Sequence, residues 1–161
     1  PVDIAAAGCH KWQMAPAGIG FLYVHPETMA RLLPTNLGWN SVERPMEWDR
    51  LHYDELRATP RRYEEGSPSL PSAAALRASL ELLEEAGFDA VDRRVRELAE
   101  RTRTALRERG MSVHPGSAGS GIVPFRHPGL SNDAVLEALD RSRVRAAVRG
   151  GWVRFSPHFY L

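Results

Sequence analysis

The spacing of apolar residues predicts two helices in the middle of the chain. Between residues 71 and 86, leucines recur every three or four positions at Leu76, Leu80 and Leu83, which places them on one helical face. Over residues 88–109 the same spacing continues for about 33 Å at the standard helical rise, long enough to bridge two lobes. A glycine follows each segment, and glycine commonly ends a helix. The apolar stripe of the second helix comprises Val91, Val95, Leu98, Thr102, Ala105 and Leu106.

The segments before these helices read as short strands, turns and an irregular stretch. Residues 2–4 are expected to end a strand, residues 5–8 to form a turn of small residues, and residues 21–24 to form a strand. Pro26 suits the first position of a short helix. Residues 35–62 lack a regular pattern, and such a stretch inside a domain is usually functional or ordered by another part of the protein. The two tryptophans of this stretch, Trp39 and Trp48, have an alternative interpretation in which they only cover the edge of a core.

After residue 110 the pattern changes to short strands around one helix. Ser131 can cap that helix, because a serine hydroxyl accepts a hydrogen bond from an N-terminal backbone amide. The order strand, strand, helix, strand, strand describes a small α+β lobe. The strands are expected at 111–114, 121–125, 144–148 and 152–155.

Composition restricts the class of protein. The hydrophobic fraction of 43% and the charged fraction of 25% are ordinary for a compact globular domain. A net charge of +1 gives no reason to expect a nucleic-acid or anionic-membrane partner, and the arginines of residues 93–109 alternate with acids as on a solvated helix face. The single cysteine, Cys9, excludes an intrachain disulfide and fits a reducing, cytoplasmic compartment. No apolar run reaches the about 18 residues of a membrane span.

One lysine stands apart from the other basic residues. Lysine and arginine together number 21, and Lys11 is the only lysine, so all the others are arginine. A guanidinium stays charged and is a poor nucleophile, whereas an amine that has lost its proton can attack a carbonyl. Lys11 is therefore a candidate catalytic residue. The alternative is an ordinary surface lysine in an arginine-rich composition.

The neighbours of Lys11 form a specific combination. His10 precedes it, Trp12 follows it, and a Pro-Ala-Gly-Ile-Gly loop over residues 16–20 leads into Phe-Leu-Tyr-Val at 21–24. This combination resembles the Schiff-base lysine segment of the class V aminotransferase family, pyridoxal-phosphate enzymes that include cysteine desulfurases, kynureninases and isopenicillin N epimerase-like proteins. By this resemblance Lys11 would form a Schiff base with pyridoxal 5'-phosphate and later move the substrate α-proton. His10 would contact the cofactor.

The resemblance implies an α/β fold in two parts. Residues 1–87 would be the C-terminal part of the cofactor-binding large domain of a fold-type I pyridoxal-phosphate-dependent transferase. Residues 88–161 would supply the connecting helix and a small α+β domain. We expect both parts to be truncated at the ends of the chain, and the family's closing helix to be missing.

Residues 62–68 carry a second part of the resemblance. Their sequence Arg-Tyr-Glu-Glu-Gly-Ser-Pro is similar to an Arg-Phe-Glu-x-Gly-Thr-Pro segment of the family. In the family the threonine hydroxyl reaches the cofactor phosphate of the other subunit, which implies a homodimer. Ser67 keeps the hydroxyl, so Gly66 and Ser67 are candidate cofactor-binding residues. Without the family, Gly-Ser-Pro is only a turn before a helix.

The last stretch of the chain resembles the family's terminal Arg-x-Ser-x-His-x-Tyr-Asn motif. Its arginine binds the α-carboxylate of the amino-acid substrate through two hydrogen bonds, for which a planar guanidinium is well shaped. This role would fall to Arg154, with Arg149 on the preceding strand as the second candidate. The alternative for Arg154 is an ordinary salt bridge at a strand end. Leu161 stands where the family has asparagine.

Several parts of the family's site are expected outside this chain. The acid that pairs with the pyridine nitrogen, the aromatic that stacks on the ring and the loop that holds the phosphate would lie upstream of Pro1. Asp3 is too near Lys11 to replace that acid, and Gly8 stands where many relatives have a phosphate-contacting serine. We therefore expect a fragment of a pyridoxal-phosphate-dependent enzyme that is inactive alone.

The reaction subtype is open between epimerase, lyase and transaminase. Cysteine desulfurases place a reactive cysteine near the substrate arginine, and no cysteine lies between Arg149 and Arg154. A cysteine desulfurase-like protein without this residue is one alternative, and a non-catalytic fragment or interaction module of the same fold is another. A third alternative is an anion-binding domain that uses the arginines, which predicts salt-dependent binding to polyanions.

Overall fold

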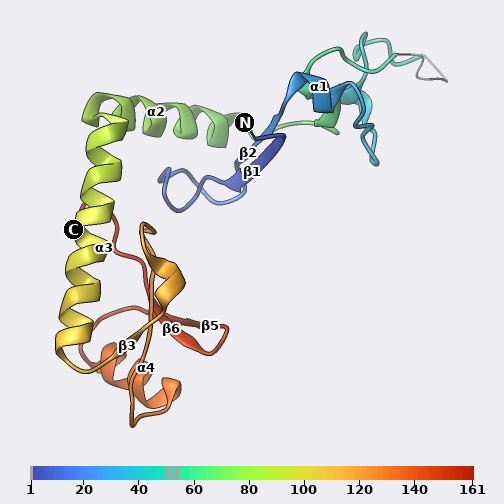
Figure 1. Cartoon of the computed structure of the whole chain (residues 1–161). Helices are drawn as coiled ribbons and strands as arrows, with labels where there is room; N and C mark the ends of the chain where they lie inside the picture. Colours follow the sequence, from blue (N-terminus) through green and yellow to red (C-terminus); the bar gives the residue numbers. More distant parts are fainter. Residues whose placement is uncertain (1, 50–51, 53–54) are drawn as a thin grey trace. The chain divides into compact units, whose positions relative to one another are not determined.

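The structure is a computed structural model that describes residues 2–49, 52 and 55–161 (Figure 1). It divides into two compact units, Pro1–Leu82 and Leu83–Leu161. Within the described residues, the first unit contains a two-stranded sheet and the second a four-stranded sheet. Helices accompany both sheets, which confirms the expected mixed α/β class. The domain boundary expected after residue 87 stays a prediction.

A β-hairpin begins the first unit. Strand β1 (Ile4–Gly8) pairs antiparallel with β2 (Gly20–Val24) along its whole length. The turn predicted at residues 5–8 is therefore wrong, because these small residues are part of a strand. Alanine has a weak preference for strands, but strand formation depends more on the contacts made across the hairpin. The cross-strand partners of the three alanines are Tyr23, Leu22 and Phe21.

Helix α1 (Pro26–Met29) follows the hairpin directly. Proline occupies its first turn, as the sequence predicted, because the fixed φ of proline suits a helix start. The Nδ1 atom of His25 accepts a hydrogen bond from the backbone amide of Glu27 at 3.4 Å. The hydroxyl of Thr28 donates to the carboxylate of Asp3 at 3.3 Å. Asp3 is thus engaged in holding α1 against the first strand.

The described part of residues 35–62 is largely irregular, as expected. Two short 3-10 helices, η1 (Trp39–Ser41) and η2 (Pro60–Tyr63), lie near its ends. An isolated bridge pairs Val42 with Leu56. This segment is therefore held by few backbone ladders, and its order depends on side chains.

Two long helices connect the sheets, as the apolar spacing predicted. Helix α2 (Leu70–Ala86) and helix α3 (Phe88–Glu108) each lie within one residue of the predicted range. Gly87 separates them with a φ of +83°, a left-handed conformation that glycine adopts without strain. Among the described helices, none has both the length and the apolar character needed to cross a bilayer.

The second unit has the predicted order of strands around one helix. Its four strands are all antiparallel and lie in the order β3-β4-β6-β5. Ser131 caps the helix as predicted, and its hydroxyl accepts a hydrogen bond from the amide of Ala134 at 3.2 Å. Besides α3, the elements are β3 (Ser112–Val113), η3 (Pro115–Ser117), β4 (Val123–Arg126), α4 (Asn132–Arg141), β5 (Ala147–Arg149) and β6 (Trp152–Phe155).

This four-stranded sheet has one apolar face and one polar face. Phe125 and Val153 form a buried core with Val135 of α4, and Leu106 of α3 packs against it. Because side chains alternate along a strand, the residues between these core positions project from the opposite face. We call this opposite side the arginine face; it carries His114, Pro124, Arg126, Arg149, Trp152 and Arg154.

One arginine of α3 contradicts the expectation of a solvated helix face. Arg103 is only 3% exposed, and its guanidinium donates to the backbone carbonyls of Ser117 and Ser120. It also donates to the carboxylate of Glu100 at 3.1 Å. A buried charge needs such partners, and the end of η3 together with the turn that follows it supplies the two carbonyls. The prediction was wrong here because Arg103 follows the buried Ala99 by one helical turn.

Candidate functional site

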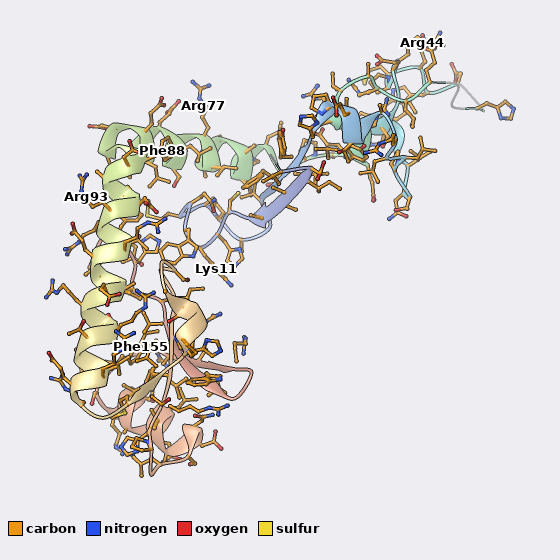
Figure 2. All side chains as sticks on the ribbon, in the orientation of Figure 1. Lys11, Arg44, Arg77, Phe88, Arg93 and Phe155 are labelled. Atoms are coloured by element: carbon orange, nitrogen blue, oxygen red, sulfur yellow. The ribbon has the colours of Figure 1, made fainter. Side chains whose placement is uncertain are left out.

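Lys11 lies in a loop that both strands of the hairpin hold in place. At the base of the loop, the amide of Cys9 donates to the carbonyl of Ile19 at 3.0 Å. The amide of Met14 donates to the carbonyl of Lys11 at 3.0 Å, which closes a turn. The Lys11 side chain is exposed and projects from this turn (Figure 2). The reactive amine predicted from the sequence is therefore accessible, on a loop with a defined backbone.

Two further contacts fix the Lys11 loop. The hydroxyl of Ser79, on α2, donates a hydrogen bond to the carbonyl of Gln13. Cys9 is 1% exposed, so its thiol is a packing group under the loop and is closed to solvent. The amine is thus presented by a support made of a strand pair, a buried thiol and a helix.

His10 lies beside Gly8, the residue that by the sequence resemblance replaces a phosphate-contacting serine. A Cβ built on Gly8 would lie 3.3 Å from Nδ1 of His10. The imidazole therefore occupies space that a larger side chain at position 8 would need. His10 is exposed, and its ring nitrogens can donate to or accept from a ligand beside Lys11.

The segment that leads to Gly66 and Ser67 is fixed by a network around η1. The Ser41 hydroxyl accepts a hydrogen bond from the Gly38 amide at 3.2 Å and donates to the Glu64 carbonyl at 2.9 Å. Ser41 is fully buried, so these bonds form away from water, where leaving a polar group unpaired is costly. The backbone just before Gly66 is thereby tied to residues more than twenty positions earlier.

The side chains of Arg57, Asn40 and Glu64 complete this network around η1. Nε of Arg57 donates to the Asn40 carbonyl at 2.8 Å, and Nδ2 of Asn40 donates to the Glu64 carboxylate at 3.0 Å. Gly66 lies near the indole of Trp39, since a Cβ on Gly66 would be 3.5 Å from its Nε1. Ser67 follows this anchored backbone and is exposed, so its hydroxyl is available to a ligand or a second subunit.

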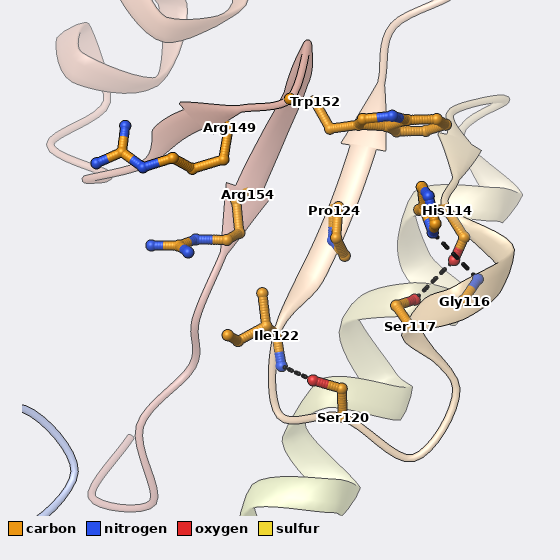
Figure 3. A pocket seen from close by; sticks show the side chains of 10 residues that line it. His114, Gly116, Ser117, Ser120, Ile122, Pro124, Arg149, Trp152 and Arg154 are labelled. Atoms are coloured by element: carbon orange, nitrogen blue, oxygen red, sulfur yellow. Dashed lines mark hydrogen bonds between the residues drawn. The ribbon is translucent and has the colours of Figure 1, made fainter. Parts of the chain in front are cut away.

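Arg149 and Arg154 line one cavity of about 560 Å³ on the arginine face (Figure 3). Their side chains extend in the same direction from the neighbouring strands β5 and β6. Nε of Arg154 is buried and has no hydrogen-bond partner among the described residues. The Arg154 guanidinium therefore keeps a donor that no described residue uses, and its role in binding a carboxylate stays a prediction. The two arginines proposed from the sequence line the same cavity.

The sequence did not indicate the other walls of this cavity. His114 and Trp152 stand edge to face with ring centroids 4.9 Å apart, and Ser117 and Ser120 lie on the turn that Arg103 holds. The signal that could have found Trp152 is the period-two alternation of β6, which places it on the same face as Arg154. The serines carry no such signal, because only the buried guanidinium brings their turn to the cavity.

The turn between β5 and β6 is tightly fixed. Gly150 and Gly151 have φ values of +56° and +77°, the conformation of a two-residue hairpin turn that favours glycine. The Gly151 carbonyl accepts hydrogen bonds from Nε of Arg126 at 2.7 Å and Nδ2 of Asn132 at 3.0 Å. The Arg126 guanidinium lies 4.3 Å from the centre of the Trp152 ring. These contacts fix the two strands that carry the paired arginines.

A surface ion pair on α3 lies outside both the Lys11 loop and the cavity on the arginine face. Arg96 donates a hydrogen bond of 2.7 Å to Asp92, and this bond lowers the pKa of the Asp92 carboxyl. A lowered carboxyl pKa gives a stabilising contribution that is present above the unfolded-state value and is lost as the pH falls through the folded-state value. Both side chains are exposed, so screening by water and salt keeps this contribution small.

Residues 1–156 match the aminotransferase class-V family. The chain belongs to this family. The resemblance inferred from the Lys11 segment is therefore confirmed at the level of the family. Class V aminotransferases are pyridoxal-phosphate-dependent, and the described residues match their fold over nearly the whole chain.

Individual class V relatives differ in activity. The chain is 31% identical to the isopenicillin N epimerase of Streptomyces clavuligerus over 99% of its length, and 30% identical to a probable cysteine desulfurase of Pyrococcus abyssi over 92%. These matches cover 44% and 36% of the two relatives, so the chain spans less than half of their length. The apo cysteine desulfurase of Thermococcus onnurineus NA1 superposes with a TM-score of 0.82 and 28% identity, over 98% of this chain and 42% of that one. The cystine C–S lyase C-DES, at 24% identity and a TM-score of 0.86, shares the fold.

The donor groups of the first unit fit two parts of pyridoxal phosphate. An accessible primary amine, Lys11, suits an aldehyde, and the exposed groups of His10 and Ser67 suit a phosphate. Asp3, which the sequence did not favour as partner of the ring nitrogen, is used by Thr28. The structure thus places Lys11 and His10 in one loop, and Arg149 and Arg154 at one cavity of the other unit.

Proposed function

We propose that this chain is part of a pyridoxal-phosphate-dependent enzyme that acts on an amino acid. It would supply the C-terminal part of a fold-type I large domain together with the small domain. The observation that carries the proposal is Lys11, the only lysine of the chain, which is exposed on a loop whose ends are hydrogen-bonded. The sequence around it resembles the Schiff-base lysine segment of the family. The epimerase, lyase and transaminase subtypes are all compatible with it.

The residues of this chain would have distinct roles in that enzyme. Pyridoxal phosphate supplies an aldehyde and an electron-withdrawing ring when bound. Lys11 would hold the aldehyde end through Nζ, while Ser67 and His10 would hold the phosphate by hydrogen bonds. Once the substrate amine has replaced it, the Lys11 Nζ would accept the proton from the substrate Cα and return it. Arg154 would bind the α-carboxylate and so orient that Cα–H bond.

Lys11→Ala tests this proposal directly. The full chain titrated with pyridoxal phosphate should develop a visible absorption band, and the Lys11→Ala variant should not. Borohydride reduction followed by peptide mapping should locate the cofactor on Lys11, because no other side chain of the sequence carries a primary amine that can form an imine. Lys11→Arg is the matched control, since it keeps the charge but cannot form the imine.

Three outcomes would count against this role. The band could persist in Lys11→Ala, the reduced cofactor could map to a residue other than Lys11, or a folded chain could give no band at all. The last result would favour a non-catalytic module of the same fold. Circular dichroism of each variant separates a lost site from a lost fold.

Ser67→Ala should weaken cofactor binding about tenfold, because one hydrogen bond to a charged phosphate is lost. Ser67→Thr should restore it, since the hydroxyl is retained. If Ser67 serves the cofactor of a second subunit, mixing Lys11→Ala with Ser67→Ala chains should yield dimers with one restored site, measured by the recovered absorption band. Equal cofactor affinity for Ser67→Ala and the unchanged chain would refute the phosphate contact.

A further inference from the structure

We propose that the cavity on the arginine face selects a ligand with two carboxylates, which it binds through Arg154 and Arg149 separately. This inference rests on the proposed function for its biological meaning: the substrate would be an amino acid whose side chain carries a second carboxylate. The cavity itself consists of described residues of one unit, so its ligand preference can be measured without the cofactor.

The two guanidiniums are placed to bind different groups. On the antiparallel pair β5–β6, Arg154 lies opposite Ala147 and Arg149 lies opposite Trp152. The two arginines are therefore diagonal neighbours on one face, whose Cβ atoms are typically about 7–8 Å apart. The two side chains extend in the same direction from the sheet, so the two carboxylates of a short diacid such as glutarate can each reach one guanidinium. One arginine can thus hold each end.

Both arginines keep donors free for a ligand. Nε of Arg154 is buried without a partner among the described residues, which is unusual for a group that loses hydration on burial. Arg149 is exposed and uses Nη1 for the carbonyl of Val148 at 2.9 Å, while no hydrogen bond of its other guanidinium nitrogens to a described residue is found. A guanidinium has five N–H donors, so a two-pronged bond to a carboxylate is available at each arginine.

The charge of the cavity also favours a doubly anionic ligand. None of the described residues that line it is acidic, so two positive charges share the space without compensation. Arg126 lies on the same sheet face and adds to the positive potential, although the Gly151 carbonyl and the Trp152 ring occupy its guanidinium. A single carboxylate would neutralise one of the two charges, whereas a diacid neutralises both.

The remaining walls suit the carbon chain of such a ligand. Ile122, Pro124 and Trp152 give the cavity apolar surface beside the guanidiniums. The fixed Gly150–Gly151 turn sets the spacing between the two arginine-bearing strands. A rigid spacing discriminates by ligand length, because little energy is lost in ordering the site on binding.

Calorimetric titration of the full chain at constant ionic strength tests the proposal. Glutarate should bind at least about tenfold more tightly than butyrate, which has one carboxylate, because a second charge-assisted pair is added. Arg149→Gln should reduce glutarate affinity to the level of butyrate and leave butyrate binding unchanged. Arg154→Lys, which keeps the charge but loses the two-pronged geometry, should weaken both ligands.

Arg145→Gln is the matched control, because it removes one exposed charge from the same unit and lies outside the cavity. It should alter neither affinity. Equal binding of glutarate and butyrate, no saturable binding of glutarate, or tighter binding of inorganic phosphate than of glutarate would each overturn the inference. None of these results affects the Lys11 absorption test, so the failure of this inference and the failure of the proposed function are distinguishable.

Discussion

Gly38→Ala is expected to unfold the segment that positions Gly66 and Ser67 while the rest of the chain stays folded. A Cβ on Gly38 would lie 1.7 Å from the carbonyl oxygen of Glu65 and 2.4 Å from its carbonyl carbon. These atoms belong to the backbone, so no side-chain rotation can relieve the clash. The backbone of Gly38 is extended, and close approach, not a left-handed φ, is the reason for glycine here.

The clash would separate the segment 38–41 from the segment 64–65, which the hydrogen bonds of Ser41 join. Overpacking of a buried site typically costs about 1–3 kcal/mol, and a backbone clash belongs at or above the upper end. Native-state hydrogen exchange should show the loss first at the amides of Asn40 and Ser41, which donate to Glu65 and Gly38. Fluorescence of Trp39 and Trp48, whose rings pack together, should shift at lower urea concentration.

Gly129→Ala provides the control for this experiment. No atom lies within 4 Å of a Cβ built on Gly129, so the added methyl group should be tolerated. If Gly38→Ala exchanges and unfolds like Gly129→Ala, the close approach of Gly38 to Glu65 is wrong. If it unfolds locally as expected, cofactor binding should weaken as strongly as in Ser67→Ala.

Arg103→Met should destabilise the second unit by about 3 kcal/mol. Methionine fills similar space, but it leaves the carbonyls of Ser117 and Ser120 and the Ser117 hydroxyl without their buried donor. Each buried polar group left unpaired costs about 1–3 kcal/mol, offset where water can enter. Urea unfolding followed by circular dichroism measures the change in unfolding free energy.

Arg93→Met is the matched control, since Arg93 lies on the exposed side of the same helix. Its effect should stay within about 0.5 kcal/mol. Arg103→Lys should recover part of the loss, because an amine can reach one carbonyl but not several. Equal stability of the Arg103→Met and Arg93→Met chains would show that the buried guanidinium does not hold the turn. Glutarate binding should fall in Arg103→Met, because Ser117 and Ser120 line the cavity.

Elements with a long apolar period were predictable from the sequence. The limits of α2 and α3 follow from the spacing of leucine and valine and from the glycine after each helix. Strand β1 was not predictable in the same way, because three alanines carry no strand signal of their own. Its formation depends on residues 21–23, which lie beyond a long loop.

The residues of the candidate site also differ in how far they could be predicted. Lys11, Ser67 and Arg154 could be identified from the sequence because each lies in a short contiguous motif. The placement of Arg149 and Arg154 at one cavity depends on strand register, and the burial of Arg103 depends on a turn fourteen residues later in the chain. Contacts of this kind are set by tertiary packing, so local sequence signals do not report them.

The two-faced sheet of the second unit restricts how its last hairpin can change during evolution. Val153 packs in the core, while Trp152 and Arg154 project to the other side. A one-residue slip of β6 against its neighbouring strands would exchange these faces, so that an arginine enters the core and a valine takes its place at the cavity. The register of β6 is therefore as constrained as the identity of its residues. Diversification of ligand preference in descendants of this chain should proceed by substitution at positions 149 and 152, with the strand register conserved.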